Sequence, residues 1–177
     1  GIAVRSEGGT VQLVWQEQGE PIPGSEEVLL AVRAAGVNRA DLLQAAGRYP
    51  PPRGASEILG LEVAGEVVQV GSAVTEWKPG DRAMALLAGG GYAEKVVVPA
   101  GQLIPIPDLL SDTDAAAIPE AFITAYLNIV IEGRFAKGES VLIHAGASGV
   151  GAAAIQLVRA LGGRPFWNTA LLAPRFL

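Results

Sequence analysis

Short runs of β-branched or alternating apolar residues fill the first hundred positions of the chain. Such runs are typical of strands, and each one here is bounded by Gly, Pro, Asp or Ser. They cover residues 11–15, 27–34, 62–70, 82–87 and 93–98. Strands this short, at this spacing, predict a small β-rich barrel or sandwich.

One helical segment interrupts the strands. Residues 39–46 read RADLLQAA, and Asn38 stands before them as an N-cap candidate. Tyr49 then leads into a run of three prolines. Proline fixes its own φ and disfavours the helical region for the residue before it. We therefore expect an extended segment soon after this helix.

Helical spacing replaces the strand pattern beyond Pro107. Ser111 is suited to cap a short Ala-rich helix, because its hydroxyl would accept a backbone N–H of the first turn. Pro119 should end that helix. Residues 120–131 then repeat apolar positions at helical intervals up to Gly133. We expect two connecting helices in this part of the chain.

A strand, a Gly-rich turn and a helix come next. Residues 140–143 predict a buried strand, 145–149 a turn, and 150–161 a helix. This order is the first βα unit of a doubly wound α/β fold. A second parallel strand should follow, but residues 164–177 contain two prolines and a weak apolar middle. We predict an atypical tail there and an incomplete dinucleotide-binding domain, since parallel sheets need covering on both faces.

Composition narrows the function. Half of the 177 residues are hydrophobic, enough for one domain or one and part of another. There is no cysteine and His144 is the only histidine, so we expect no disulfide and no metal site. The net charge of −5 and the lack of a basic cluster argue against a nucleic-acid partner.

The longest apolar run, residues 121–131, is about half of a bilayer span. With no signal-peptide pattern at Gly1, this predicts a cytoplasmic protein without a membrane partner.

The Gly-rich turn carries the clearest chemistry. In the sequence VLIHAGASGVGAAAIQLV, glycines would let a dinucleotide pyrophosphate approach the free N–H groups and the positive dipole end of the helix. The spacing G-x-x-G-x-G departs from the usual fingerprint, and nothing acidic follows Glu139 to bond a ribose. An ordinary Gly-rich turn is therefore the alternative. The candidate cofactor-binding residues are Gly146, Ala147, Ser148, Gly149, Val150 and Gly151.

Five long motifs together resemble one family. They are AAGVNRADLLQAAGRYPPP, LGLEVAGEVVQVG, GDRAMALLAGGGYAEKVVVP, AAAIPEAFITAY and HAGASGVGAAAIQL. On these motifs, residues 1 to about 163 resemble the zinc-independent quinone oxidoreductases of the medium-chain dehydrogenase/reductase superfamily, especially p53-inducible quinone oxidoreductase-like members. The resemblance implies a GroES-like catalytic domain over residues 1–110. Connecting helices and the start of a Rossmann domain would follow over residues 111–163, with residues 164–177 as the atypical tail. NADPH, with NADH not excluded, would bind between the two domains.

The same resemblance implies that no zinc is bound. Zinc-dependent alcohol dehydrogenases of this superfamily use a cysteine and a His-Glu pair at the metal. Asn38 lies where that cysteine would be, and Leu61 and Glu62 replace the pair. Glu62 is then expected to be an internal, hydrogen-bonded carboxylate. Reduction would have to rely on hydride transfer from the nicotinamide, which suits quinones.

The resemblance also assigns roles to individual residues. Asn38 and Tyr49 match an Asn and a Tyr that are proposed to contact cofactor or quinone, so they are the candidate catalytic residues. Thr124 matches a position that lines the nicotinamide pocket. Each has a structural alternative: a helix cap for Asn38, packing beside the prolines for Tyr49, and a hydroxyl bonded to the preceding helical turn for Thr124. His144 is expected to be structural or to lie at the cofactor edge.

Several functions stay open at this point. An NAD(P)H-dependent quinone reductase is the first interpretation. An enoyl or alkenal reductase shares the scaffold and the metal-free hydride transfer. An inactive truncated product is the third, and it predicts little or no reductase activity for the isolated chain. An RNA-binding relative is disfavoured by the acidic charge. Full-length relatives are expected to be homodimers.

Overall fold

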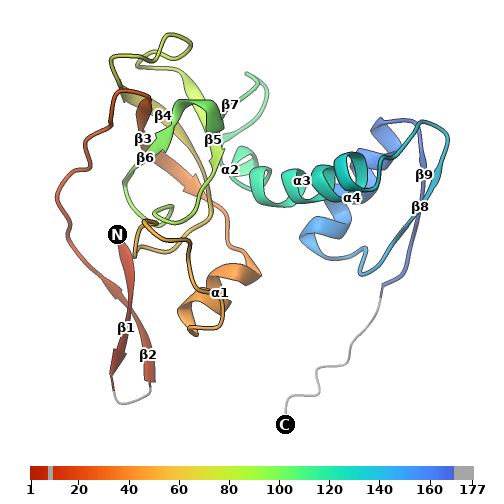
Figure 1. Ribbon diagram of the computed structural model, residues 1–177, viewed down its shortest axis with the longest axis horizontal. Helices are drawn as coiled ribbons and strands as arrows, with labels where there is room; N and C mark the ends of the chain where they lie inside the picture. Colours follow the sequence, from red (N-terminus) through yellow and green to blue (C-terminus); the bar gives the residue numbers. More distant parts are fainter. Residues whose placement is uncertain (8–9, 170–177) are drawn as a thin grey trace. The chain divides into compact units, whose positions relative to one another are not determined.

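The computed structural model describes residues 1–7 and 10–169, which form two compact units (Figure 1). The first unit is Gly1–Pro119 and the second begins at Glu120. Strands and short helices of the first unit are β1 (Ile2–Glu7), β2 (Thr10–Trp15), β3 (Glu27–Ala35), α1 (Arg39–Ala45), β4 (Glu62–Val70), β5 (Arg82–Leu86), β6 (Lys95–Pro99), η1 (Ala100–Gln102), β7 (Leu103–Pro105) and α2 (Asp112–Ala115). The later elements are α3 (Pro119–Tyr126), η2 (Leu127–Glu132), β8 (Ser140–Ile143), α4 (Gly149–Ala160) and β9 (Arg164–Trp167).

A five-stranded antiparallel sheet forms the centre of the first unit. Its strand order is β6-β3-β4-β5-β7. The apolar positions read from the sequence point into one core, where Val28, Leu30, Val63 and Val67 are fully buried. The pairing of β3 with β4 shifts register twice, and such bulges bend and twist a sheet. The prediction of a β-rich first region is thereby confirmed.

The N-terminal hairpin of β1 and β2 is a separate two-stranded sheet. Backbone hydrogen bonds tie its first strand to the rest of the unit. The Ile2 N–H donates to the Tyr92 carbonyl at 2.9 Å, and the Leu59 N–H donates to the Ile2 carbonyl at 3.3 Å. The sequence pattern did not predict β7 or η1, because three residues are too few to show a period.

Helix α2 begins as the sequence predicts. The Ser111 hydroxyl accepts the Asp114 backbone N–H at 3.1 Å, which makes it an N-cap. The Arg82 guanidinium also holds the start of this helix, donating to Asp112 Oδ1 at 2.6 Å and to the Leu110 carbonyl at 2.8 Å. The short helix therefore stays attached to strand β5.

The expected helix over residues 120–131 is present but changes type. Pro119 is the first residue of α3, a position where proline costs no hydrogen bond. From Leu127 the chain continues as the π-helix η2. There the Gly133 N–H donates to the Asn128 carbonyl, five residues back, at 2.9 Å. Sequence periodicity does not separate the two helix types over so few residues.

The prediction that residues 164–177 lack a second parallel strand is wrong for their first part. Arg164–Trp167 form β9, which pairs with β8 in parallel register. Pro165 is tolerated because only alternate residues of a parallel strand bond a given neighbour. The Arg164 N–H donates to the Glu139 carbonyl at 2.9 Å and the Asn168 N–H to the Ile143 carbonyl at 3.3 Å, so the missing Pro165 N–H is not needed. Residues 170–177 lie outside the described part.

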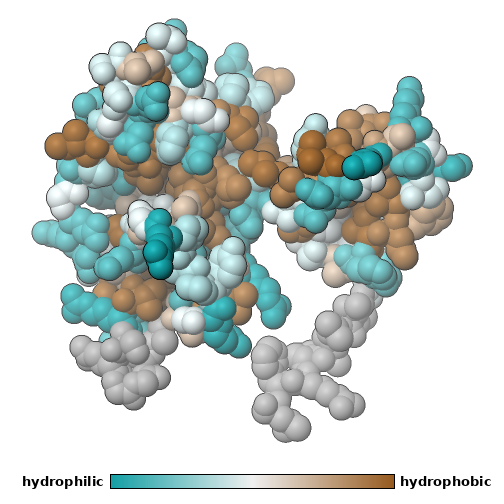
Figure 2. Space-filling view, viewed as in Figure 1, coloured by the Kyte–Doolittle hydropathy of each residue, from teal (hydrophilic) through white to brown (hydrophobic). Residues whose placement is uncertain are grey.

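Helix α4 packs on this small parallel sheet. Its buried residues Ala153, Ala154 and Val158 meet Ile143 of β8 and Ala125 of α3 in one core. Figure 2 shows hydrophobic residues at the surface of both units, and Leu142 and Phe166 of the parallel pair are 64% and 58% exposed. Among the described residues, no helix is long and apolar enough to cross a membrane.

Candidate functional site

A polar cluster surrounds the start of α1. The Asn38 side-chain amide donates to Glu62 Oε1 at 2.8 Å, and the Asn38 backbone N–H donates to Asp41 Oδ2 at 2.7 Å. The Tyr92 hydroxyl donates to Asp41 Oδ2 at 2.8 Å and to the Gly36 carbonyl at 3.2 Å. Three segments of the chain, at residues 36–41, Glu62 and Tyr92, therefore meet at this point.

Both carboxylates of the cluster are buried. Asp41 and Glu62 are each 3% exposed, and Glu62 is the internal hydrogen-bonded carboxylate that the sequence predicts. Burial, the hydrogen bond to Asp41 and the negative charges of Asp41 and Glu62 raise the pKa of Tyr92 above its usual value. Tyr92 therefore stays a neutral donor to Asp41 at physiological pH.

Asn38 holds the N-cap position predicted from the sequence. Its backbone is extended, and Asp41 closes a capping box by accepting the Asn38 backbone N–H. The side-chain NH2 group of Asn38 also donates to Glu62 Oε1, which ties the start of the helix to strand β4. Asn38 is partly exposed.

Gly36 explains how Glu62 fits beside the helix. A methyl group at Gly36 would overlap the Glu62 carboxyl group, so a larger residue would force that buried carboxyl group to move. This requirement comes from close packing, because Gly36 does not have a positive φ. Sequence reasoning found Asn38 and Glu62 but missed Asp41, Gly36 and Tyr92, the last of which lies 51 positions from Asp41.

Tyr49 lies in the segment after α1 and is 49% exposed. Two apolar side chains near Asn38 in the sequence are more exposed still, Val37 at 79% and Leu42 at 66%. In the described structure, no hydrogen bond joins Tyr49 to Asn38.

The Gly-rich turn precedes the 12-residue helix α4 in the second unit. The Ser148 hydroxyl caps the helix by accepting the Gly151 N–H at 3.0 Å. The N–H groups of Gly149 and Val150 come first in the helix, where no carbonyl of the same helix reaches them. Ala147, Ser148, Gly149 and Val150 are exposed, whereas Gly146 and Gly151 are buried.

The glycines of the turn serve different purposes. A Cβ at Gly149 would meet no atom within 4 Å, so space for a ligand lies beside it. A Cβ at Gly151 would overlap the Ala145 carbonyl, and one at Gly146 would come within 2.6 Å of the Trp167 ring. The donor set and the open space at Gly149 fit a dinucleotide pyrophosphate. Thr124 is half-buried on α3, and its carbonyl accepts the Asn128 side-chain amide at 2.8 Å.

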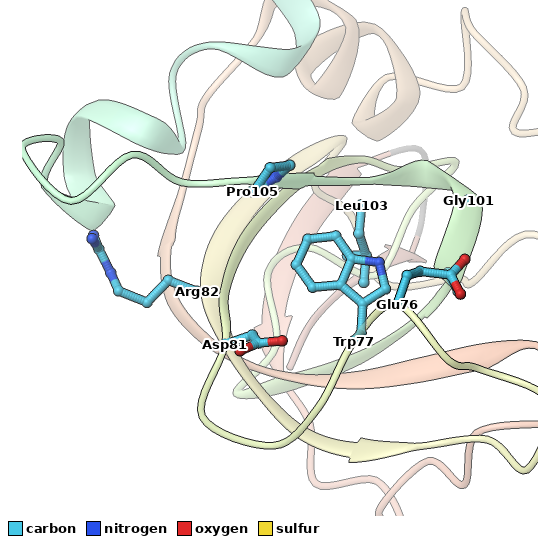
Figure 3. Close-up of a pocket in the computed structure, with 8 residues that line it drawn as sticks. Glu76, Trp77, Asp81, Arg82, Gly101, Leu103 and Pro105 are labelled. Atoms are coloured by element: carbon cyan, nitrogen blue, oxygen red, sulfur yellow. The ribbon is translucent and has the colours of Figure 1, made fainter.

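Two cavities of the first unit lie away from these residues. One, of about 510 Å³, is lined by Trp77, Leu103 and Pro105 among others, and in Figure 3 the Trp77 ring lies in the middle of it while Arg82 extends away. The other, of about 940 Å³, is bordered by Trp15, Ile58 and Val96 among others. Neither is lined by Asn38 or Tyr49, so cavity size does not locate the predicted chemistry here.

Metal ligands do not gather in the part of the chain that the structure describes. No group of three His, Asp or Glu side chains lies together there as a metal ion would require. Asp41 and Glu62, the two buried acidic residues, are occupied with Tyr92 and Asn38. The absence of zinc remains a prediction.

Comparison with known proteins shows what this chain is similar to. Residues 24–108 match the alcohol dehydrogenase GroES-like domain. The chain is 41% identical to the synaptic vesicle membrane protein VAT-1 homolog of Rattus norvegicus over 85% of its own length and 37% of that protein's length. The quinone oxidoreductase of Thermus thermophilus, solved also with NADPH, is 39% identical with a TM-score of 0.74. That match covers 94% of this chain and 52% of the other.

The CurK enoyl reductase is also similar, with 32% identity and a TM-score of 0.80 over 88% of this chain and 49% of that one. The chain therefore carries a GroES-like domain over residues 24–108 and is similar to both quinone oxidoreductases and enoyl reductases. It spans about half the length of the solved relatives that it matches.

Proposed function

We propose that this protein takes part in the reduction of quinones by hydride transfer from a nicotinamide cofactor, NADPH or NADH. One observation carries the proposal. Asn38, at the start of α1, has its amide held by the buried Glu62, in a chain that is 39% identical to a quinone oxidoreductase solved with NADPH. An amide in this position can orient a ligand without supplying a Lewis acid.

The Gly-rich turn supports the cofactor part of the proposal. The exposed N–H groups at the start of α4 would receive the pyrophosphate, and the open space at Gly149 leaves room for it. Ser148 takes the third N–H of the helix, which leaves two donors for phosphate oxygens. Thr124 would contact the nicotinamide half, as the family resemblance implies.

Quinone reduction requires no protein group to supply the hydride or the proton. The cofactor supplies a hydride to the quinone, and a proton from solvent completes the hydroquinone. The chain's own residues bind and orient the reactants. The Tyr49 phenol would donate a hydrogen bond to the quinone oxygen that becomes negative, and the exposed Val37 and Leu42 would contact the apolar ring.

Enoyl reduction is the second candidate. The similarity to the CurK enoyl reductase favours it as directly as the Thermus thermophilus protein favours quinones. Both reactions use the same hydride, but the enoyl acceptor takes it at carbon and its α-carbon must then be protonated. The exposed apolar residues around Asn38 suit both acceptors.

A turnover assay separates the two candidates. The protein is incubated with NADPH and either a simple quinone or an α,β-unsaturated carbonyl compound, and loss of NADPH is followed. Saturable quinone turnover that falls in Asn38→Ala and Tyr49→Phe supports the proposal. Tyr126→Phe serves as the matched control, since Tyr126 is similarly exposed on α3 and has no proposed role. Turnover of the unsaturated carbonyl alone would replace quinone reduction with enoyl reduction.

A further inference from the structure

Asn168, at the end of β9, makes an unusual set of contacts with the Gly-rich turn. Its backbone N–H donates to the Ile143 carbonyl at 3.3 Å, and its carbonyl accepts the Gly146 N–H at 2.9 Å. Its side-chain Oδ1 accepts the Ala145 N–H at 3.2 Å, and its Nδ2 lies 3.3 Å from His144 Nδ1. One residue thus contacts four consecutive positions that lead into the turn.

The segment it holds is strained. Ala145 has a φ of +54°, in the left-handed region that side chains other than glycine rarely adopt. Such a conformation persists only where surrounding contacts determine it. The two hydrogen bonds that Asn168 accepts come from the N–H groups of Ala145 and its neighbour Gly146. The Ala145 carbonyl in turn accepts the Ser148 N–H at 2.9 Å. Asn168 is therefore linked through Ala145 to the residue that caps α4.

We propose that Asn168 is a positioning residue that fixes the Gly-rich turn in the conformation that receives a dinucleotide phosphate. The proposal rests on the cofactor role proposed above for that turn. Asn168 acts through Ala145 and Gly146, because its own contacts are with the turn backbone. Loss of the side chain should let Ala145 relax from its left-handed conformation and move Ser148 and Gly149 away from their phosphate-binding geometry.

The orientation of the Asn168 amide also determines which ring nitrogen of neutral His144 carries the proton. Because Oδ1 must accept the Ala145 N–H, Nδ2 faces the imidazole as a donor. His144 Nδ1 is then the acceptor, which places the ring proton of neutral His144 on Nε2. This gives His144 a structural role at the edge of the turn, in agreement with the expectation from the sequence.

The test compares three variants of the 177-residue chain by NMR. Asn168→Ala removes both side-chain contacts, and Asn168→Asp keeps an acceptor for the Ala145 N–H. Gln156→Ala is the matched control, since this exposed amide on α4 bonds only its own helix, at Ala152. Amide hydrogen exchange at Ala145 and Gly146 reports the conformation of the turn. Amide shifts of Gly149 and Val150 during titration with NADPH report binding.

We expect Asn168→Ala to speed exchange at Ala145 and Gly146 by about tenfold or more and to weaken NADPH binding by about fivefold, the ratio expected for one lost net hydrogen bond. Asn168→Asp should keep exchange slow, and Gln156→Ala should change neither measurement. Unchanged exchange and unchanged NADPH affinity in Asn168→Ala would overturn the role of Asn168. If the unmodified chain shows no NADPH-induced shifts, the proposed cofactor function fails, while the exchange rates still decide whether Asn168 fixes the turn.

Discussion

The two candidate regions of this molecule are built in opposite ways. The cluster at Asn38 is closed by the protein itself, with two carboxylates at 3% exposure and every segment tied to another. The Gly-rich turn is open: Gly149 is exposed, and no atom lies within 4 Å of the position that a Cβ would take there. Side chains supply the hydrogen-bond partners of the first region, whereas a ligand would supply those of the Gly149 and Val150 N–H groups in the second.

This difference predicts how each region responds to substitution. Changes that disturb the buried carboxylates of the Asn38 cluster should act mainly on the stability of the first unit, because they leave buried polar groups without partners. Changes at the open face of the turn should act mainly on ligand binding. Predictions that separate stability from binding therefore test the comparison directly.

The largest effect is expected from Gly36→Ala. The new methyl group would displace the buried Glu62 carboxyl group and break its bond with Asn38, so we expect a loss of about 2–3 kcal/mol in unfolding free energy. Urea denaturation measures this loss. Gly101→Ala is the control, because a Cβ there meets nothing within 4 Å. Equal stability of the two variants would mean that the cluster is not tightly closed.

Gly149→Val should affect ligand binding and not stability, in contrast to Gly36→Ala. It should leave the urea midpoint nearly unchanged, because no atom lies within 4 Å of its Cβ, but it should weaken NADPH binding by about tenfold or more by filling the phosphate space. NMR titration of the Ser148 amide measures the affinity. Gly151→Ala, whose Cβ would overlap the Ala145 carbonyl, should reduce both stability and binding. Normal NADPH binding by Gly149→Val would remove the turn from the proposed site.

Tyr92→Phe should have a smaller effect, with a characteristic pH dependence. Loss of the hydrogen bond to Asp41 should cost about 1 kcal/mol at neutral pH. The pKa of Tyr92 is raised in the folded state, so its stabilisation is fully present below about pH 10, the ordinary tyrosine value, and is lost as the pH rises through the raised pKa. In denaturation experiments at increasing alkaline pH, the difference in unfolding free energy between Tyr92→Phe and the unmodified protein should shrink. A difference that does not shrink with rising pH would contradict this assignment.

Zinc should have no measurable effect. The family resemblance implies that Asn38 and Leu61 stand where related zinc enzymes have metal ligands, and the described residues contain no group of three candidate ligands. Neither added zinc nor a chelator should change the melting temperature. Elemental analysis that finds about one zinc per purified chain would contradict the prediction.

Sequence patterns predicted the ordinary strands and helices better than the proline-containing strand β9 and the π-helix η2. The strands with Val28 and Val63, and the βα unit at Gly149, have clear periods and punctuation. Strand β9 was missed because Pro165 argues against a strand unless the bonded register is known. The π-helix η2 was missed because its apolar spacing over six residues does not differ enough from an α-helix.

The candidate site was predicted in part for a similar reason. Asn38 and Glu62 stood out through a motif, and their bond at 2.8 Å joins residues 24 positions apart. Tyr92 and Asp41 are 51 positions apart and carry no local signal, so only the folded chain brings them together. Asn168 was hidden for the same reason, since its partners at the turn precede it by more than 20 positions.

Because Trp167 packs against Gly146, its fluorescence can report on the conformation of the Gly-rich turn. The indole lies directly beside the glycine, and the Arg159 guanidinium stands 5.4 Å from the ring centroid. With Trp15 and Trp77 replaced by phenylalanine, the one remaining indole would report on the turn through its fluorescence. A phosphate arriving at the start of α4, or a shift of β9, should change its emission without any added label.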